Sequence, residues 1–166
     1  NNTMVANGGG IYFDDGPVDP QVAIRNNIIV GNTIGLGADP AFHATVSAFE
    51  NNLLSGNTRA TYHVTAPIGS AGNISTTPKF RNQDAGDYHL QATSPAVDSG
   101  SDLAAPLNDF DGNARPTDGD GDGEALFDIG AFEAPAGPAY DVTIQDDSTG
   151  DLLRFNSDSG HFAYVH

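Results

Sequence analysis

The stretch N-N-I-I-V-G-N at residues 26–32 decides the fold, because similar stretches lie 25 residues before and after it. NNTMVAN occupies residues 1–7 and NNLLSGN occupies residues 51–57, so the three stretches share the pattern N-N-x-x-x-x-N. Repeats of about 20 to 50 residues are typical of proteins in which one structural unit stacks on the next. The sequence therefore predicts stacked repeats in the first half of the chain.

The residues between the Asn positions predict the kind of repeat. Each repeat contains short β-like runs separated by small and polar residues, and long helical periodicity is absent. This pattern favours an all-β parallel solenoid, a β-helix with coils of about 25 residues that stack about 4.8 Å apart. A leucine-rich horseshoe has a similar period, but its L-x-x-L-x-L spacing is missing. Two apolar rows should form the core ladders, and they are Met4, Ile29 and Leu54, and Ile24, Phe49 and Ile74.

The repeated Asn residues predict a structural ladder along the stack. Asn tolerates left-handed backbone and hydrogen-bonds to neighbouring backbone, so it suits a recurring turn. Stacked Asn amides also bond to one another along the axis of such an assembly. Asn side chains that line a sugar-binding face are the alternative interpretation. The residues predicted for the ladder are Asn1, Asn26, Asn51, Asn7, Asn32 and Asn57.

Composition changes along the chain predict four segments. Residues 1–80 contain the repeats, and residues 81–133 read as a cap that covers the otherwise open end of the solenoid. APAGPAY at residues 134–140 has the composition of a linker. Residues 141–166 contain three β-like runs separated by turn residues, which predicts a small antiparallel β-meander.

Acidic residues are densest in D-G-D-G-D-G-E at residues 118–124. Carboxylates at alternate positions of a Gly-rich loop converge on a hard cation, and D-x-D-x-D-G matches the first half of a Ca²⁺ loop. The second half departs from an EF-hand, because Ile129 occupies the twelfth position. A solvated acidic loop without an ion is the alternative. The residues predicted to bind a structural Ca²⁺ are Asp118, Asp120, Asp122, Glu124 and Asp128, with Asp109 and Asp111 as further candidates.

The overall charge limits the partners of the chain. Its 166 residues include 22 acidic and six basic residues, which give a formal charge of -16. Such a charge opposes binding to nucleic acid or to an anionic membrane surface. No apolar run is long enough for a membrane span. The chain has no Cys, so disulfides and thiolate metal sites are excluded.

Several motifs outside the Asn stretches resemble a known family. GGGIYF at residues 8–13 and the N-N-x-x-x-x-N repeats are similar to the right-handed parallel β-helix of pectate-lyase-like proteins. The ordered motifs P-K-F, G-D-Y-H-L, S-P-A-V-D-S-G, D-F-D-G-N-A-R-P and D-I-G-A-F-E resemble the terminal segment of secreted bacterial β-helix proteins called choice-of-anchor Q. The resemblance implies an extracellular or cell-surface location. It implies little about activity, because one fold hosts many functions.

Catalysis is not indicated within these residues, since the hydrolase signatures N-T-D, G-H-G and R-I-K do not occur. We therefore expect a non-catalytic module with a structural, adhesive or filament-forming role. The alternative is the C-terminal part of a secreted polysaccharide lyase or glycoside hydrolase. Expected partners are other coils of a parent chain or a second copy, and glycans on the sequons at Asn1 and Asn73.

Overall fold

The computed structural model describes residues 1–14, 22–39, 44–46, 48–66, 71–138, 142–145, 149, 152–155 and 162–165. Within these residues the protein is all-β, because the regular structure consists of short strands and one 3-10 turn, without an α-helix. The elements are β1 (Thr3–Val5), β2 (Gly9–Phe13), β3 (Ala23–Arg25), β4 (Ile28–Val30), β5 (Ile34–Ala38), β6 (Ala44–Thr45), β7 (Ala48–Glu50), β8 (Leu53–Ser55), β9 (Arg59–Tyr62), β10 (Val64–Thr65), β11 (Phe80–Asn82), η1 (Gln83–Ala85), β12 (Asp87–Leu90), β13 (Val142–Gln145), β14 (Leu152–Phe155) and β15 (Phe162–Val165).

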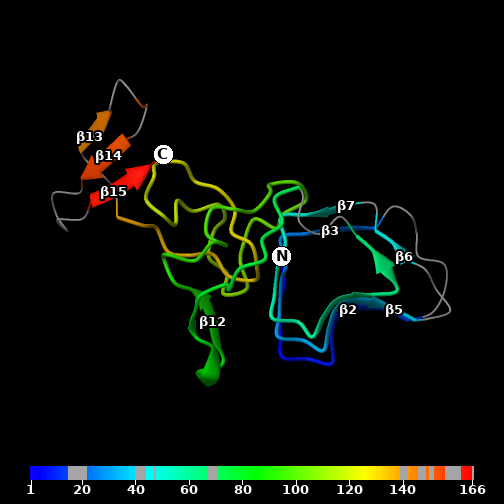
Figure 1. Ribbon diagram of the computed structural model, residues 1–166. Helices are drawn as coiled ribbons and strands as arrows, with labels where there is room; N and C mark the ends of the chain where they lie inside the picture. Colours follow the sequence, from blue (N-terminus) through cyan, green and yellow to red (C-terminus); the bar gives the residue numbers. More distant parts are fainter. Residues whose placement is uncertain are drawn as a thin grey trace.

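The repeats form short parallel sheets whose strands come from successive repeats. The strand orders are β1-β4-β8, β2-β5-β9 and β3-β7, together with the short pair β10-β6. In the first of these sheets Ile28 lies opposite both Thr3 and Leu53, so the register advances by 25 residues per strand. Figure 1 shows the repeats following nearly the same path, one behind another. The sequence period is therefore the strand register.

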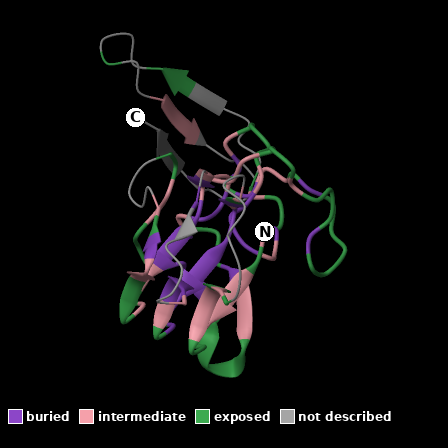
Figure 2. Ribbon diagram, turned by 90° about the vertical axis from the view of Figure 1, so that its right-hand side faces the viewer, coloured by how far each residue is buried: buried purple, intermediate pink, exposed green. Residues whose placement is uncertain are grey.

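The first hydrophobic core lies between these sheets. Met4, Ile29 and Leu54 occupy equivalent positions in β1, β4 and β8, and Ile24 lies opposite Phe49. Ile29 and Phe49 are completely buried in this core. Figure 2 shows buried residues concentrated where the strands stack and exposed residues at the turns. These five residues pack in the two rows that the sequence predicts.

Ile74 departs from the predicted row. It forms a parallel bridge with Leu53, not with Phe49, and it packs against the second core cluster. The reason is a shorter last interval, because Asn73 follows Asn52 in the Asn ladder after 21 residues. The assignment of Ile74 to the row of Phe49 is therefore wrong.

One of the two predicted Asn ladders is present as expected. The Asn57 side-chain oxygen accepts hydrogen bonds from the backbone N–H of Asn32, at 2.9 Å, and from its side-chain amide, at 3.0 Å. The backbone N–H of Asn7 donates to Asn32 Oδ1 in the same way, at 2.9 Å. This ladder satisfies backbone donors at a turn that recurs in every repeat.

The other ladder is formed by the second Asn of each pair, which corrects the prediction of Asn1, Asn26 and Asn51. Asn52 Oδ1 accepts from the backbone and side-chain nitrogens of Asn27, at 3.0 and 2.9 Å. Asn2 bonds to Asn27 in the same manner, and Asn73 continues the row after Asn52. The side-chain amide nitrogen of Asn73 also donates to Phe49 O at 2.6 Å. The amide of this predicted glycosylation sequon is therefore engaged in a hydrogen bond within the repeats.

The first Asn of the pair has a different task. Asn26 and Asn51 have left-handed backbone, with φ of 55° and 49°. This conformation turns their side chains away from the ladder and toward the segment that follows the repeats. The Asn26 amide donates to Ser101 O at 2.7 Å, and the Asn51 amide donates to Ser99 O at 3.0 Å.

The segment after the repeats, residues 75–137, packs beside the stack (Figure 1). Ile28, Val30 and Leu53 are buried in a second core together with Phe80 and Ile129 of this segment. The segment contacts all three repeats laterally, since it also bonds to Thr3, Asn26 and Asn51. We name it the lateral segment. The expected cap over the end of the stack is therefore wrong in position, because the apolar outer face of β1-β4-β8 attracts the segment to the side.

Two antiparallel sheets complete the described fold. β11 pairs with β12 within the lateral segment, and η1 joins the two strands. β13, β14 and β15 form a three-stranded antiparallel sheet in that order. The predicted meander is thus confirmed in its strand order.

Candidate functional site

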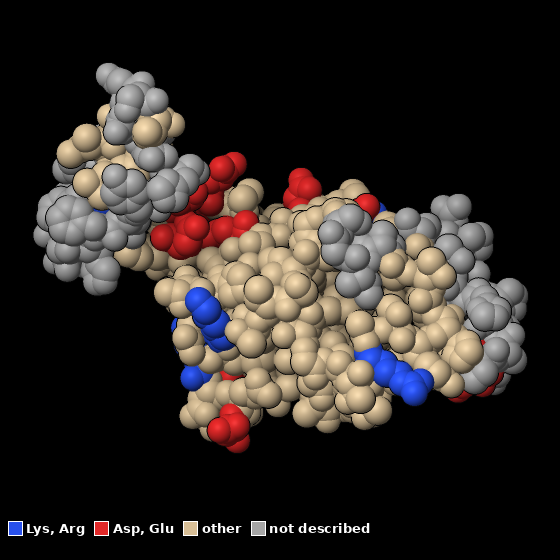
Figure 3. All heavy atoms as spheres, viewed as in Figure 1, with Lys and Arg blue, Asp and Glu red and all other residues tan. Residues whose placement is uncertain are grey.

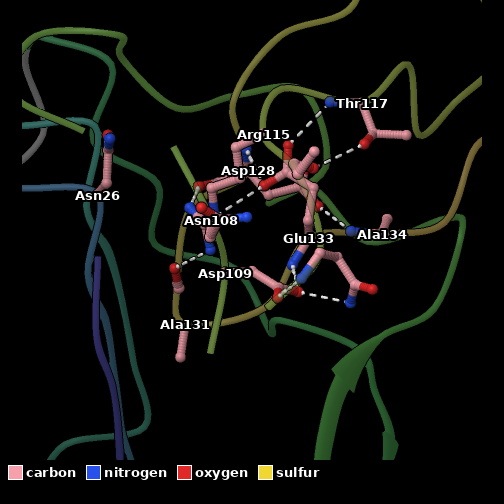
Figure 4. A network of polar contacts seen from close by, with 12 residues as sticks. Asn26, Asn108, Asp109, Arg115, Thr117, Asp128, Ala131, Glu133 and Ala134 are labelled. Carbon is pink, nitrogen blue, oxygen red and sulfur yellow. Dashed lines mark hydrogen bonds and ion pairs between the residues drawn. The ribbon is translucent and has the colours of Figure 1, made fainter. Parts of the chain in front are cut away.

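The lateral segment contains a buried polar network around Arg115 (Figure 4). The Arg115 guanidinium donates to the carbonyl oxygen of Gly130 at 2.9 Å and, with a longer distance of 3.4 Å, to that of Asp128. Its Nε lies 3.2 Å from Glu133 Oε2, which makes an ion pair, although the geometry is not that of a hydrogen bond. Both side chains are almost fully buried. Arg115 therefore ties two ends of the loop 115–133 together.

Asp109 connects a second loop to this network. Its Oδ1 accepts from the backbone N–H groups of Asp111 and Asn113, at 2.9 and 2.8 Å, and its Oδ2 accepts from the Glu133 N–H at 3.0 Å. Burial alone would raise the pKa of Asp109, but these hydrogen bonds outweigh burial and lower it. Asp109 is thus a structural anion whose oxygens are already used.

Asp128 is completely buried behind the same loop. Its two oxygens accept from the N–H groups of Asp98, at 2.8 Å, and Ala134, at 2.6 Å. Burial raises the pKa of Asp128 to about 7, and the charge of Glu133 acts in the same direction. Burial likewise raises the pKa of Glu133, against the opposing effect of Arg115. Among the described carboxylates, Arg115 therefore pairs with that of Glu133 alone, and the pKa values of both Asp128 and Glu133 rise.

The acidic loop at residues 118–124 lies on the surface of the lateral segment, and Figure 3 shows acidic side chains gathered on part of the face in view. Asp118 accepts the N–H groups of Gly121 and Gly123, at 2.7 and 2.8 Å. Asp120 accepts the N–H of Asp122 at 2.9 Å. The carboxylates thus shape the loop by bonding to its own backbone.

Three carboxylates converge beside this loop. Oxygens of Asp98, Asp118 and Asp120, the acidic triad, lie within 4.8 Å of one another. Asp98 also accepts the N–H groups of Gly119 and Asp120 at 2.9 Å, and that of Leu126 at 3.2 Å. Burial raises the pKa of the Asp98 carboxyl, although these hydrogen bonds act in the opposite direction. Carboxylate oxygens are the kind of ligand that Ca²⁺ prefers.

Only part of the predicted metal set belongs to the triad. Asp118 and Asp120 are in it. Asp122 is half-buried and its carboxylate accepts the Glu124 N–H, whereas Glu124 is exposed. Asp128 lies in the buried network and Asp109 in its own loop, so these two are not among the converging carboxylates. Asp111 bonds to His89. Sequence reasoning missed Asp98, which lies 20 residues before Asp118; no spacing rule links the two.

His89 forms a separate surface cluster. Its Nδ1 lies 2.6 Å from Asp87 and its Nε2 lies 2.8 Å from Asp111, and its ring is packed on Phe132 with centroids 4.2 Å apart. The hydrogen bond to Asp111, followed by that to Asp87, raises the pKa of His89. His89 therefore fastens the β12 strand to the loop of Asp111.

The described residues contain no helix that is both long and apolar enough to cross a membrane. In comparisons with known proteins, no family model, no curated protein and no solved structure matches the chain.

Proposed function

We propose that this chain is a right-handed parallel β-helix module with a non-catalytic, structural role in an extracellular protein. The 25-residue strand register over three repeats supports the β-helix. The handedness and the extracellular location rest on the resemblance of the sequence motifs to secreted β-helix proteins.

The use of the polar side chains carries the proposed role. Asn side chains of the repeats bond to the backbone of the preceding repeat or of the lateral segment. Asp109, Asp128 and Glu133 accept backbone N–H groups, and Arg115 donates to backbone carbonyls. Groups that are committed in this way hold the chain together and are poorly placed to move protons on a substrate. The module therefore acts through its shape and rigidity.

A structural Ca²⁺ at the acidic triad is the second part of the proposal. Asp98 Oδ2 accepts two N–H groups, but Asp98 Oδ1 and both oxygens of Asp118 accept one each, so these oxygens keep a further lone pair for a cation. A cation would also offset the repulsion among three carboxylates in a chain with a formal charge of -16. In this role the ion fastens the 118–124 loop to Asp98.

Spin labels test the β-helix, because the chain has no Cys of its own. Thr33 and Thr58 are exposed and occupy equivalent positions, since their N–H groups donate to Asn7 O and Asn32 O. The double variant Thr33→Cys/Thr58→Cys should show dipolar broadening, as neighbouring strands lie about 4.8 Å apart. The control pair Thr33→Cys/Asp84→Cys places one label in η1, outside the stacked sheets, and should show less broadening. Equal spectra from the two pairs would contradict the proposed stacking.

An activity assay tests the non-catalytic role. The chain should release neither unsaturated uronates nor reducing sugars from acidic polysaccharides such as polygalacturonate, with and without Ca²⁺. Turnover that scales with enzyme concentration would favour the alternative, a part of a polysaccharide lyase or hydrolase.

A further inference from the structure

The first repeat has one unpaired side. Within the described residues β1 pairs only with β4, and β2 pairs only with β5. β4 and β5, in contrast, have a strand on each side. β1 and β2 are thus edge strands, each with one unpaired edge that faces away from the second repeat. We call these two edges together the free face.

The backbone of the second and third repeats shows what the free face lacks. Ile28 N donates to Asn2 O at 2.8 Å, and Ile34 N donates to Gly8 O at 3.1 Å, each toward the preceding repeat. Thr3 and Gly9 occupy the equivalent positions in the first repeat. Their N–H groups therefore point out of the free face, and no acceptor meets them among the described residues.

The Asn ladders end at the same face with two unfilled positions. Asn32 and Asn57 each donate their side-chain amide to a carbonyl of the preceding repeat, Met4 O at 3.1 Å and Ile29 O at 2.8 Å. The equivalent amide of Asn7 has no acceptor in the described part of the chain. Asn27 Oδ1 accepts two hydrogen bonds from the preceding repeat, whereas Asn2 Oδ1, its equivalent, accepts none there.

Beside β1 the protein has a cavity of about 560 Å³ between the first repeat and the lateral segment. Met4, Tyr88, Phe110 and Phe132 contribute apolar walls. The side-chain nitrogen of Asn1, which also lines this cavity, is buried and has no partner. In the next repeats, the residues equivalent to Asn1 donate to the lateral segment, as Asn26 does to Ser101. The space is thus bordered by both apolar surface and an unsatisfied amide.

We propose that the free face is an interaction surface for one further β-coil that carries the N-N-x-x-x-x-N pattern. Such a coil presents carbonyls to Thr3 N, Gly9 N and Asn7 Nδ2 at the spacing of a parallel strand, and its second Asn donates to Asn2 Oδ1. It also places apolar side chains over the open core at Met4. The coil extends an interface that the three repeats already form twice. The inference rests on the proposed β-helix, and it adds the chemistry of the partner.

An added coil tests the proposal. A copy of residues 26–50 joined ahead of Asn1 places its own Asn pair in register with Asn1 and Asn2, because the copy has the length of the strand register. We expect the melting temperature to rise by several degrees, since stacked repeats stabilise their neighbours. The amides of Thr3 and Gly9 should exchange with solvent at least about tenfold more slowly than in the unextended chain.

An altered copy is the control for this test. It carries Asn27→Ala and Asn32→Ala, and it should lose most of the added protection. An intact copy that protects neither Thr3 nor Gly9 would overturn the proposal, as would equal protection by the altered copy. So would an unextended chain that dimerises in light scattering and protects these amides, because a second copy would then cover the face. Broadening of the Thr33 and Thr58 labels is measured separately, so a failure here is distinguishable from a failure of the β-helix.

Discussion

Asn26 and Ser101, 75 residues apart in sequence, exchange two hydrogen bonds: the Asn26 amide donates to Ser101 O at 2.7 Å, and Ser101 N donates to Asn26 Oδ1 at 2.8 Å. Asn26 is completely buried. The pair joins the second repeat to the lateral segment, so both must fold for either bond to form. A turn residue of the repeat is in this way also the attachment point of the rest of the protein.

Replacing Asn26 should therefore destabilise the whole fold. Asn26→Ala removes two hydrogen bonds of a buried side chain. It also places Ala in left-handed backbone, where Ala has no polar side chain to offset the steric cost. The expected loss in the free energy of unfolding is about 2 to 4 kcal/mol. Asn26→Gly keeps the backbone conformation available and should lose less. Asn51→Ala removes one such bond and is the matched control. Chemical denaturation gives the three free energies of unfolding, and an Asn51 loss larger than that of Asn26 would contradict this account.

Phe49 should be the most sensitive single residue of the repeat core. It is fully buried against residues of neighbouring strands. Phe49→Ala should lower the free energy of unfolding by about 3 to 5 kcal/mol, because a large side chain is removed from a closed core. Phe110→Ala makes the same chemical change at a ring that is 81% exposed, and its loss should stay below about 1 kcal/mol. Similar losses in the two variants would show that Phe49 is not in a closed core.

Asp128 should titrate near neutral pH. Its folded pKa of about 7 lies above the ordinary value of 3.8, so the folded protein binds this proton more tightly than the unfolded chain does. The contribution of Asp128 to stability is then fully present below about pH 4 and is lost as the pH rises through about 7. Carbon-13 NMR of the Asp128 carboxyl gives the midpoint directly. A midpoint near 4 would mean that its two backbone donors outweigh burial.

His89 should show a pH dependence of the same sign on the surface. Its pKa is raised by Asp111 and Asp87, so its contribution is present below the ordinary His pKa and is lost as the pH rises through the raised value. His89→Gln keeps a polar side chain but removes this titration. The expected result is a flatter dependence of the melting temperature on pH in the variant. An unchanged pH dependence would show that the two ion pairs add no stability.

The strand register could be predicted from the sequence because the Asn pairs recur at the same 25-residue interval. The sequence did not place the lateral segment, although the signal was present in Ile28, Ile29 and Val30. Three consecutive apolar residues in a strand indicate burial on both faces, since alternate side chains point to opposite sides. Ile29 packs in the inner core, whereas Ile28 and Val30 pack in the second one. The outer face of this sheet therefore required a covering segment.

The candidate metal site was predicted only in part because it joins residues distant in sequence. Asp118 and Asp120 lie in one acidic loop, and local spacing is enough to find them. Asp98 reaches them only because its carboxylate accepts three N–H groups between Gly119 and Leu126, a contact set by tertiary structure. Asp128 is the same residue type in the same stretch, yet its burial places it in another network. Charge density along a sequence does not distinguish these two environments.

Removing Ca²⁺ should loosen the acidic loop if the triad binds this ion. A ligand that binds only the folded state stabilises it by about 2.7 kcal/mol at one hundred times its dissociation constant. We therefore expect a chelator to lower the melting temperature, added Ca²⁺ to restore it, and Mg²⁺ to restore it less, because Mg²⁺ demands a stricter geometry.

Asp118→Asn should abolish the Ca²⁺-dependent shift, since it removes one charge of the triad. Asp122→Asn removes the same charge from a half-buried residue outside the triad, so it should keep the shift. Comparing the shift between the two variants, instead of their absolute melting temperatures, separates the ion from the Gly121 and Gly123 hydrogen bonds that Asp118→Asn also weakens. Equal melting temperatures of the unmodified chain in chelator and in Ca²⁺ would show that the carboxylates shape the loop without an ion.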